Sequence, residues 1–487
     1  MSAEDRLPAA RAVLASLLGH SDFRPAQARV VRAMLARRDV LAVLPTGAGK
    51  SVCFQVPALL EAGITVVVSP LISLMDDQVV AVRRRGFPAA ALTSLSSPSD
   101  RGEVARALAS RRLKLLYVSP ERLATGAFRR LLGGCSISRV AVDEAHCISE
   151  WGHDFRPAYR RIATFCAAMG RPPVAAFTAT ATPATRADIE ASLVLRDSVK
   201  VVGHVDRPNL WWGVETARSL AAGACRVMQV VRRTAGAGIV YLPTRERASR
   251  LAEALIRTGV PAVPYHAGLS ADARRSVQQG FLASRHRVVC ATNAFGMGID
   301  HAHVRFVCHL GVPGSLEAYV QEAGRAGRDG GRARCLLLSC PGDFRLQRGL
   351  AASKWPSPRL LSAVWESMPA GRAISVAEVR ERLGRRAAEE PVGAALRLLI
   401  EQGCARRARP TGAPDEEAVV RGPASLRRRI DFSAPSRGRA RAAERLEAMR
   451  RYLRRRDCRR AMLAAYFGQP APSCAGCDSC DARRRPG

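Results

Sequence analysis

The sequence predicts an α/β protein with two consecutive parallel sheets, followed by a small helical domain and a cysteine-bearing end. Through the first 350 residues, short uninterrupted apolar runs alternate with helical patterns. After residue 351 these runs give way to short helices and a basic hairpin, and four cysteines then fall within 23 residues. The 487 residues suffice for three or four domains of roughly 100–200 residues each.

The first sheet is predicted from five apolar runs without polar alternation. Such runs are typical of strands buried on both faces, as in a parallel sheet. They are Val40–Leu44, Ile64–Val68, Leu115–Val118, Val140–Val142 and Val174–Phe177. A polar motif follows each run, so we expect these motifs to meet at the carboxyl edge, where open α/β sheets bind ligands.

A second sheet is predicted from five further runs of the same kind. They are Ile239–Leu242, Ala262–Tyr265, Val288–Ala291, Phe306–Leu310 and Cys335–Leu338. The join lies near the sequence Asp-Arg-Pro-Asn at residues 206–209. We therefore expect one domain over residues 1–206 and a second over residues 207–350.

Residues 356–430 predict a winged-helix-like domain, with a generic small helical domain as the alternative. Three helical patterns come first, and the second opens with a capping box at Ser375–Glu378. Pro391 at a first turn and Gly403 as a stop delimit the third. A basic strand at Cys404–Arg409 and a return strand at Ala418–Arg421 complete the pattern.

The last segment, residues 436–487, predicts a helical hairpin with a metal site. Its first helix has one narrow apolar stripe on an arginine-rich surface, and Arg459–Phe467 forms the second. Cys458, Cys474, Cys477 and Cys480 are separated by fifteen, two and two residues. Four thiolates suit tetrahedral zinc in a closed structural site. An iron–sulfur cluster is the alternative, because such clusters also use Cys-x-x-Cys spacing.

The net charge of +34 predicts a polyanionic partner such as nucleic acid. Arginine supplies 72 of the 76 basic residues; a GC-rich genome would favour arginine over lysine but would not set the sign of the net charge. Residues 331–487 carry 33 basic and 16 acidic residues, half of the excess. With no export signal, no apolar run of 18 residues and mostly scattered cysteines, we expect a cytoplasmic protein.

The segment Leu44-Pro-Thr-Gly-Ala-Gly-Lys-Ser predicts a phosphate-binding loop between a strand and a helix. Around Thr46, Gly47 and Gly49 the backbone N–H groups could close on phosphates. Lys50 would reach the β- and γ-phosphates, and Ser51 would hold Mg²⁺. Lys50 is one of only four lysines in the chain, which fits a site where an arginine fork cannot replace a compact ammonium.

Two further motifs carry groups suited to phosphoryl transfer. Asp143 and Glu144 end an apolar run, where the first could bind Mg²⁺ through water and the second could orient and deprotonate the attacking water. An exposed acidic turn is the alternative. Arg325 and Arg328 lie among small residues in the second block, and one of them could act as an arginine finger.

Together these motifs resemble the superfamily 2 helicases, and the neighbouring residues resemble the RecQ family of DNA helicases. The most specific stretch is Asp-Glu-Ala-His-Cys-Ile-Ser-Glu-Trp-Gly-His-Asp-Phe-Arg at residues 143–156, a continuation that DEAH-type RNA helicases lack. Phe23–Gln27, Phe177–Thr182, Tyr265–Leu269 and Ala291–Asp300 fit other motifs of the family. The resemblance covers roughly residues 10–345 and resumes at Cys458-Arg-Arg and Tyr466-Phe-Gly.

The resemblance implies two RecA-like domains with ATP between them. Arg24 and Gln27 would contact adenine, and His20 stands where the family often has a stacking aromatic ring. Arg325 and Arg328 correspond to the family's motif VI arginines, with Arg328 as the finger. The resemblance also favours zinc over iron–sulfur at the cysteines.

The segment Ser149–Arg156 resembles the family's aromatic-rich loop, which senses single-stranded DNA. Trp151 and Phe155 offer stacking faces, and Arg156 offers a phosphate or cation–π contact. We expect His153 and His266 to couple DNA binding to ATP hydrolysis together with these residues. Packing between domains is the alternative interpretation of the aromatic side chains.

Two departures from the family layout stand out. The apparent winged helix precedes the cysteines instead of following them, and its wing, residues 406–421, has no aromatic residue. Only a short basic stretch, residues 481–487, follows the last cysteine in this sequence, so we expect no counterpart of the family's small C-terminal nucleic-acid domain in it.

The leading hypothesis is an ATP-driven helicase that translocates on single-stranded DNA and unwinds forked or tailed duplexes in repair or recombination. The resemblance implies movement in the 3′ to 5′ direction. A DNA-stimulated ATPase that does not separate strands and an RNA helicase are the alternatives. Single-strand-binding or repair proteins are candidate partners, and the chain could act as a monomer.

Overall fold

The computed structural model describes residues 4–70, 72–93, 96–123, 125–149, 155–295, 301–384, 388–408 and 418–484. The chain forms two compact units. The first contains residues 1–311, 317–340 and 454–487, and the second contains residues 312–316 and 341–453. The division near residue 454 falls inside the stretch 436–487 that the sequence groups together.

The first sheet has seven parallel strands in the order β3-β4-β2-β5-β6-β1-β7. The strands are β1 Val40–Val43, β2 Ile64–Val68, β3 Ala89–Leu92, β4 Leu115–Val118, β5 Ile137–Val142, β6 Val174–Thr178 and β7 Val199–Val202. The predicted parallel sheet is confirmed, and the two strands that the sequence did not predict, β3 and β7, lie at its edges.

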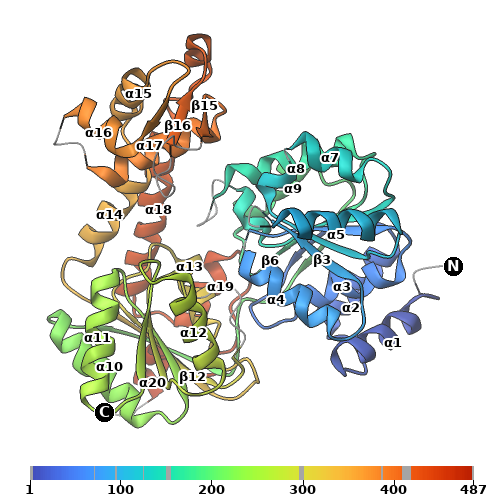
Figure 1. Cartoon of the computed structure of the whole chain (residues 1–487). Coiled ribbons are helices and arrows are strands. Elements are labelled where there is room, and N and C mark those ends of the chain that lie inside the picture. Colours follow the sequence, from blue (N-terminus) through green and yellow to red (C-terminus); the bar gives the residue numbers. More distant parts are fainter. Residues whose placement is uncertain are drawn as a thin grey trace. The chain divides into compact units, whose positions relative to one another are not determined.

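Helices cover both faces of this sheet (Figure 1). They are α1 Leu7–Leu18, α2 Pro25–Leu35, α3 Lys50–Leu60, α4 Ile72–Arg83, α5 Pro98–Ala109, α6 Pro120–Leu123, α7 Gly126–Leu132, α8 Arg161–Ala168 and α9 Pro183–Leu193. Along β1, Val40 and Ala42 belong to the core under α1–α4, whereas Leu41 and Val43 belong to the core on the other face. Both faces are buried, which explains the unbroken apolar runs.

The second sheet has six parallel strands in the order β10-β11-β9-β12-β13-β8. The strands are β8 Leu210–Thr216, β9 Ala237–Tyr241, β10 Ala262–Tyr265, β11 Val288–Ala291, β12 Val304–Leu310 and β13 Ala333–Ser339. Its helices are α10 Leu220–Arg233, α11 Arg245–Arg257, α12 Ala271–Leu282 and α13 Leu316–Ala323. The strand that the sequence did not predict, β8, is again an edge strand.

The second unit has the element order of a winged helix: helix, strand, two helices, two strands. These are α15 Pro358–Ser367, β14 Ala373–Ser375, α16 Val376–Leu383, α17 Glu389–Glu401, β15 Ala405–Ala408 and β16 Ala418–Arg421. The hairpin β15–β16 is antiparallel as predicted, and β14, which was not predicted, pairs with β16. The predicted capping box opens α16, since Ser375 and Glu378 exchange two hydrogen bonds. Helices α14 Asp343–Lys354 and α18 Ala434–Arg454 flank this domain in sequence.

The cysteines lie in the first unit with two short helices, α19 Arg459–Tyr466 and α20 Asp478–Arg484. This segment packs on the edge of the second sheet, where Trp212 of β8 forms a bridge with Cys477. Within the described ranges, no helix is both long and apolar enough to cross a membrane.

Candidate functional site

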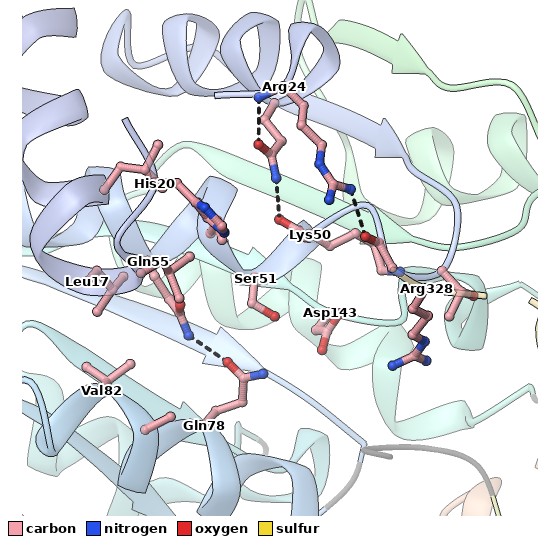
Figure 2. Close-up of a pocket in the computed structure, with 18 of the residues that line it drawn as sticks. Leu17, His20, Arg24, Lys50, Ser51, Gln55, Gln78, Val82, Asp143 and Arg328 are labelled. Carbon is pink, nitrogen blue, oxygen red and sulfur yellow. Dashed lines mark hydrogen bonds between the residues drawn. The ribbon is translucent and has the colours of Figure 1, made fainter. Parts of the chain in front are cut away.

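A cavity of about 880 Å³ in the first unit gathers side chains that the sequence assigns to a nucleotide site. Its walls come from α1, the loop before α3, α4, the end of β5 and the segment after α13. The lining includes the predicted residues His20, Arg24, Gln27, Thr46, Gly47, Gly49, Lys50, Ser51, Asp143, Glu144, Arg325 and Arg328. Lys50, Ser51 and Asp143 lie between His20 at one end and Arg328 at the other (Figure 2).

The loop before α3 has the backbone of a phosphate cradle. Gly47 and Gly49 adopt φ values of 81° and 72°, which favour glycine. Helix α3 begins at Lys50, directly after Gly49, so its unpaired N–H groups and positive dipole end face the cavity. The Lys50 ammonium lies 3.5 Å from the Leu44 carbonyl oxygen, leaving its charge beside the loop.

Arg24 and Gln27 hold this loop in shape. The Gln27 amide nitrogen donates to the carbonyls of Ala48 at 2.9 Å and Gly49 at 3.3 Å. Its amide oxygen accepts from the Arg24 backbone N–H at 2.9 Å, and the Arg24 guanidinium donates to the Gly47 carbonyl at 2.9 Å. Both residues therefore contact the phosphate loop, while their contact with adenine stays a prediction.

The end of the cavity near His20 contains residues that the sequence did not single out. The Gln55 amide donates to Gln78 at 2.6 Å and to the Tyr117 hydroxyl at 2.9 Å, and Leu17 and Val82 supply apolar surface (Figure 2). The lining residues Leu17, Gln55, Gln78 and Val82 come from helices α1, α3 and α4. They belong to no motif, so no sequence signal marked them.

The carboxylates follow β5, as predicted. The Glu144 backbone N–H donates to Asp143 Oδ1 at 2.9 Å, and Glu144 adopts a left-handed φ of 46° that is uncommon outside glycine. Burial, reinforced by the neighbouring Glu144 charge, raises the pKa of Asp143 to about 7. A cation stabilises such a buried carboxylate, and the carboxylate of Asp143 and the hydroxyl of Ser51, which line the same cavity, are oxygen ligands of the kind that Mg²⁺ prefers.

His146 ties the carboxylates to the next strand. Its Nδ1 lies 3.0 Å from the Thr178 hydroxyl, at the end of β6, and 3.3 Å from Glu144 Oε2. The Tyr159 hydroxyl donates to the Asp143 carbonyl at 3.0 Å. These contacts fix the turn that presents Glu144 to the cavity.

The two predicted arginines line the cavity from the side of the second sheet. A Cβ atom added at Gly47 would lie 3.4 Å from Arg328 Cγ, and one added at Gly324 would lie 3.4 Å from Thr46 Cβ. Arg325 is buried and hydrogen-bonds to Tyr241 at the end of β9. Arg328 is therefore the arginine whose side chain runs along the loop (Figure 2).

Of the predicted DNA-coupling residues, Trp151 and His153 lie outside the described residues. Phe155 is partly buried with the Arg160 guanidinium 5.2 Å above its ring. Arg156 donates to the Pro70 carbonyl at 3.0 Å, after β2. His266 follows β10 in the second sheet and lies 3.2 Å from the Ser249 hydroxyl.

The four predicted cysteines converge. Their sulfur atoms all lie within 4.8 Å of one another, and Cys474 and Cys477 are 3.7 Å apart. Cys477 is buried and the other three are partly buried. The set fits a closed tetrahedral site for a metal that prefers thiolates.

Comparisons with known proteins agree with these features. Residues 24–189 match the family model of DEAD/DEAH box helicases, and residues 224–330 match the helicase conserved C-terminal domain. An ATP-dependent DNA helicase RecQ from Synechocystis is 42% identical over 335 residues, which cover 67% of this chain and 70% of that protein. This chain belongs to the RecQ family. The RecQ zinc-binding model matches residues 423–481, which include all four cysteines and support zinc over an iron–sulfur cluster.

Other RecQ relatives are longer. The ATP-dependent DNA helicase RecQ of Haemophilus influenzae is 42% identical over 352 residues, which cover 72% of this chain but 56% of that protein. The chain thus spans little more than half the length of this relative.

Among solved structures, the helicase MrfA bound to DNA matches with a TM-score of 0.58 at 19% identity, covering 71% of this chain and 50% of that one. The Mycobacterium smegmatis helicase Lhr bound to single-stranded DNA matches with a TM-score of 0.56 at 20% identity, covering 88% and 62%. Both likenesses concern the fold.

Proposed function

We propose that this RecQ-family chain is an ATP-dependent DNA helicase that moves 3′ to 5′ on single strands and unwinds tailed or forked duplexes. One observation carries the proposal: a single cavity joins the phosphate loop and carboxylates of the first sheet to the arginines of the second. A nucleotide bound there would contact both sheets, so its hydrolysis could change how they are held together. The relatives named as DNA helicases support this activity.

In this proposal, Lys50 and the N–H groups of the loop bind the β- and γ-phosphates. Ser51 and Asp143 hold Mg²⁺, which supplies charge neutralisation at the phosphates. Glu144 orients the attacking water and accepts its proton, and Arg328 stabilises the charge that develops during phosphoryl transfer. Arg325 supports the segment that carries Arg328. His20, Arg24 and Gln27 border the adenine base.

DNA is the proposed partner because of the charge of +34 and the loop after the carboxylates. Phe155 and Arg156, together with Trp151 and His153, would stack on or contact the strand, and His266 would face it from the second sheet. Arg156 also donates to the Pro70 carbonyl after β2. Binding of single-stranded DNA at this loop could therefore change the conformation of the ATP site. We place this activity at the bacterial nucleoid, in repair or recombination, with single-strand-binding or repair proteins as candidate partners.

We assign helicase domains to residues 1–206 and 207–350, a winged-helix-like domain to 356–430 and a zinc module to 436–487. The zinc site ties down a segment with little apolar core of its own.

Unwinding assays on matched 3′-tailed and 5′-tailed duplexes test the proposal, with Glu144→Gln as the inactive control. We expect unwinding of the 3′-tailed duplex alone, dependent on ATP and Mg²⁺. DNA-stimulated ATP hydrolysis without strand separation would instead indicate a remodelling ATPase, and stimulation by RNA in preference to DNA would indicate an RNA helicase.

A further inference from the structure

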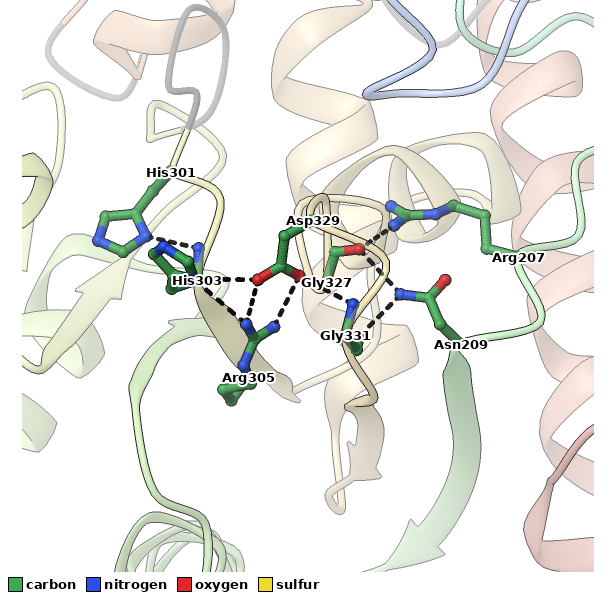
Figure 3. A network of polar contacts seen from close by, with 8 residues as sticks. All are labelled: Arg207, Asn209, His301, His303, Arg305, Gly327, Asp329 and Gly331. Carbon is green, nitrogen blue, oxygen red and sulfur yellow. Dashed lines mark hydrogen bonds and ion pairs between the residues drawn. The ribbon is translucent and has the colours of Figure 1, made fainter. Parts of the chain in front are cut away.

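The segment that carries the two motif VI arginines is held by the linker between the sheets. We call residues 203–209 the linker and residues 324–331 the finger segment. The Arg207 guanidinium donates to the Gly324 carbonyl at 2.8 Å and also to the Gly327 carbonyl. The Asn209 amide donates to the carbonyls of Gly327 and Gly331, both at 2.8 Å. Three carbonyls that flank Arg325 and Arg328 are thus bound by two linker side chains; Figure 3 shows the contacts at Gly327 and Gly331.

The opposite side of the finger segment is held by Arg305 of β12 and by His303, which directly precedes this strand. Asp329, next to Arg328, accepts from Arg305 at 3.0 Å, contacts His303 Nδ1 at 2.9 Å and accepts from the Gly331 N–H at 3.0 Å. The Arg305 guanidinium holds the pKa of Asp329 well below its usual range, so this carboxylate stays charged. Figure 3 shows Arg207 and Asn209 on one side of the segment and Arg305 and His303 on the other.

Helix α19 of the zinc module in turn holds the linker. The helix begins after the zinc ligand Cys458, and its Arg460 is almost fully buried. Arg460 donates to the Asp206 carboxylate at 2.5 Å and to the Leu210 carbonyl at 3.0 Å, on either side of Arg207. Just beyond the helix, Gln469 accepts from the Val205 N–H at 2.8 Å and donates to the Gly203 carbonyl at 2.9 Å.

Helix α19 also reaches the helix that leads into the finger segment. The Tyr466 hydroxyl donates to Glu317 Oε1 at 2.8 Å. Glu317 is buried in the first turn of α13, which ends at Ala323, directly before Gly324. The zinc module therefore contacts the finger segment's support at two independent places, the linker and α13. These contacts give a role to the isolated stretches Cys458-Arg-Arg and Tyr466-Phe-Gly.

We propose that Arg207 and Asn209, supported by Arg460 and Tyr466 of the zinc module, are positioning residues for the arginine finger. The inference rests on the proposed function, because it assigns Arg328 to phosphoryl transfer. Hydrogen bonds thus connect the zinc module to the finger segment through the linker and α13. Through these bonds the zinc module would affect the rate of ATP hydrolysis, in addition to any role in binding DNA. Positioning affects the transition state more than ground-state binding, so the loss of a positioning residue should lower kcat and leave KM nearly unchanged.

The test is a double-mutant cycle between Arg207→Met and Arg328→Ala, read as kcat and KM for ATP hydrolysis. Arg207→Met alone should lower kcat by about tenfold to hundredfold, the size of effect that small misplacements of a reacting group produce. In the Arg328→Ala background the same change should have little further effect, because the group it positions is already gone. Arg207→Lys should restore only part of the rate, since one ammonium does not reproduce a planar fork between two carbonyls.

Arg287→Met is the matched control. Arg287 also donates to backbone carbonyls in the second sheet's domain, those of Val231 at 2.5 Å and Thr234 at 2.7 Å, neither of which lies in the finger segment. It should leave kcat unchanged. Tyr466→Phe removes a single hydroxyl and should lower kcat severalfold while zinc content stays at one per chain, which tests the proposal even if Arg207→Met does not fold.

The outcomes separate the two proposals. If Arg328→Ala leaves kcat unchanged, the assigned function of the finger is wrong. If Arg328→Ala lowers kcat but Arg207→Met lowers it equally in both backgrounds, or changes only KM, the positioning role is wrong. Full activity of Tyr466→Phe would overturn the part assigned to the zinc module.

Discussion

Replacing Gly49 by alanine should damage the phosphate loop through one identifiable neighbour, Gln27. A Cβ atom at Gly49 would lie 2.5 Å from Gln27 Nε2, closer than real contacts allow, and Gly49 has a left-handed φ of 72°. Gly19, at the end of α1, has the same φ of 72°, and no atom of the described residues lies within 4 Å of an added Cβ. Gly19→Ala is therefore a control that carries the same backbone strain without the clash.

The expected difference follows from the contacts of Gln27. The left-handed backbone costs alanine roughly 1–2 kcal/mol at either position, so this contribution cancels between the two variants. At Gly49 the displaced amide also loses its hydrogen bonds to the Ala48 and Gly49 carbonyls, each contributing about 0.5–1.5 kcal/mol. Gly49→Ala should thus be about 1–3 kcal/mol less stable than Gly19→Ala and should bind ATP about tenfold more weakly or worse.

Urea denaturation and titration with a fluorescent ATP analogue measure both quantities. Removing the amide first, as Gln27→Ala, should abolish most of the extra effect of Gly49→Ala, because nothing is left to collide with. Equal stability of Gly49→Ala and Gly19→Ala, or an undiminished difference in the Gln27→Ala background, would refute this reasoning.

Four further predictions test the proposed site. Glu144→Gln should bind ATP and DNA yet hydrolyse ATP about 10²–10⁴-fold more slowly, because an amide cannot accept the proton of water; turnover within about tenfold of the unaltered chain contradicts that role. Arg328→Ala should lower kcat about 10³-fold or more with little change in ATP affinity, whereas a change in KM alone would make Arg328 a ground-state contact. Metal analysis should find one zinc per chain, and Cys477→Ser should give protease-sensitive protein; stoichiometric iron with visible absorption would overturn zinc. Phe155→Ala and Trp151→Ala should fold and bind ATP but lose DNA stimulation of the ATPase, since a stacked base contributes about 1–3 kcal/mol; normal stimulation and unwinding would leave the loop a packing element.

The strands of the two large sheets that the sequence did not predict all lie at sheet edges: β3, β7 and β8. An edge strand lacks a neighbour on one side, so fewer of its side chains must be apolar, as in β7 and β8. β3 is apolar and mostly buried, but three of its four residues are alanines, which have a low strand propensity. In β7 only Val201 is fully buried, and Lys200 is exposed beside Glu190. The inner strands are buried on both faces, so their apolar runs were sufficient to predict them.

The residues of the site are of two kinds: those that a sequence motif identifies and those that only tertiary contacts bring to the cavity. Lys50, Ser51, Asp143 and Glu144 all line the cavity, and the sequence could single them out because phosphate and metal chemistry restricts which residues can serve at each spacing. Gln55 was not, because its contacts to Gln78 and Tyr117 join three elements far apart in the sequence. Only the fold brings Gln55 and Gln78 together at one wall of the cavity.

Two glycines show how the motifs and the less recognisable residues depend on each other. At Gly49 the position of a Cβ is taken by the Gln27 amide nitrogen, and at Gly327 it is taken by the Asn209 amide nitrogen. In each case the amide donates to carbonyls of the loop that contains the glycine. The glycine is needed because the amide approaches so closely, and the amide holds the loop because the glycine leaves room. Both segments that meet the phosphates in the proposed reaction, the phosphate loop and the finger segment, are thus shaped by a side chain from a neighbouring segment. A substitution of either partner in such a pair should therefore change the same loop, even though only one partner belongs to a recognisable motif.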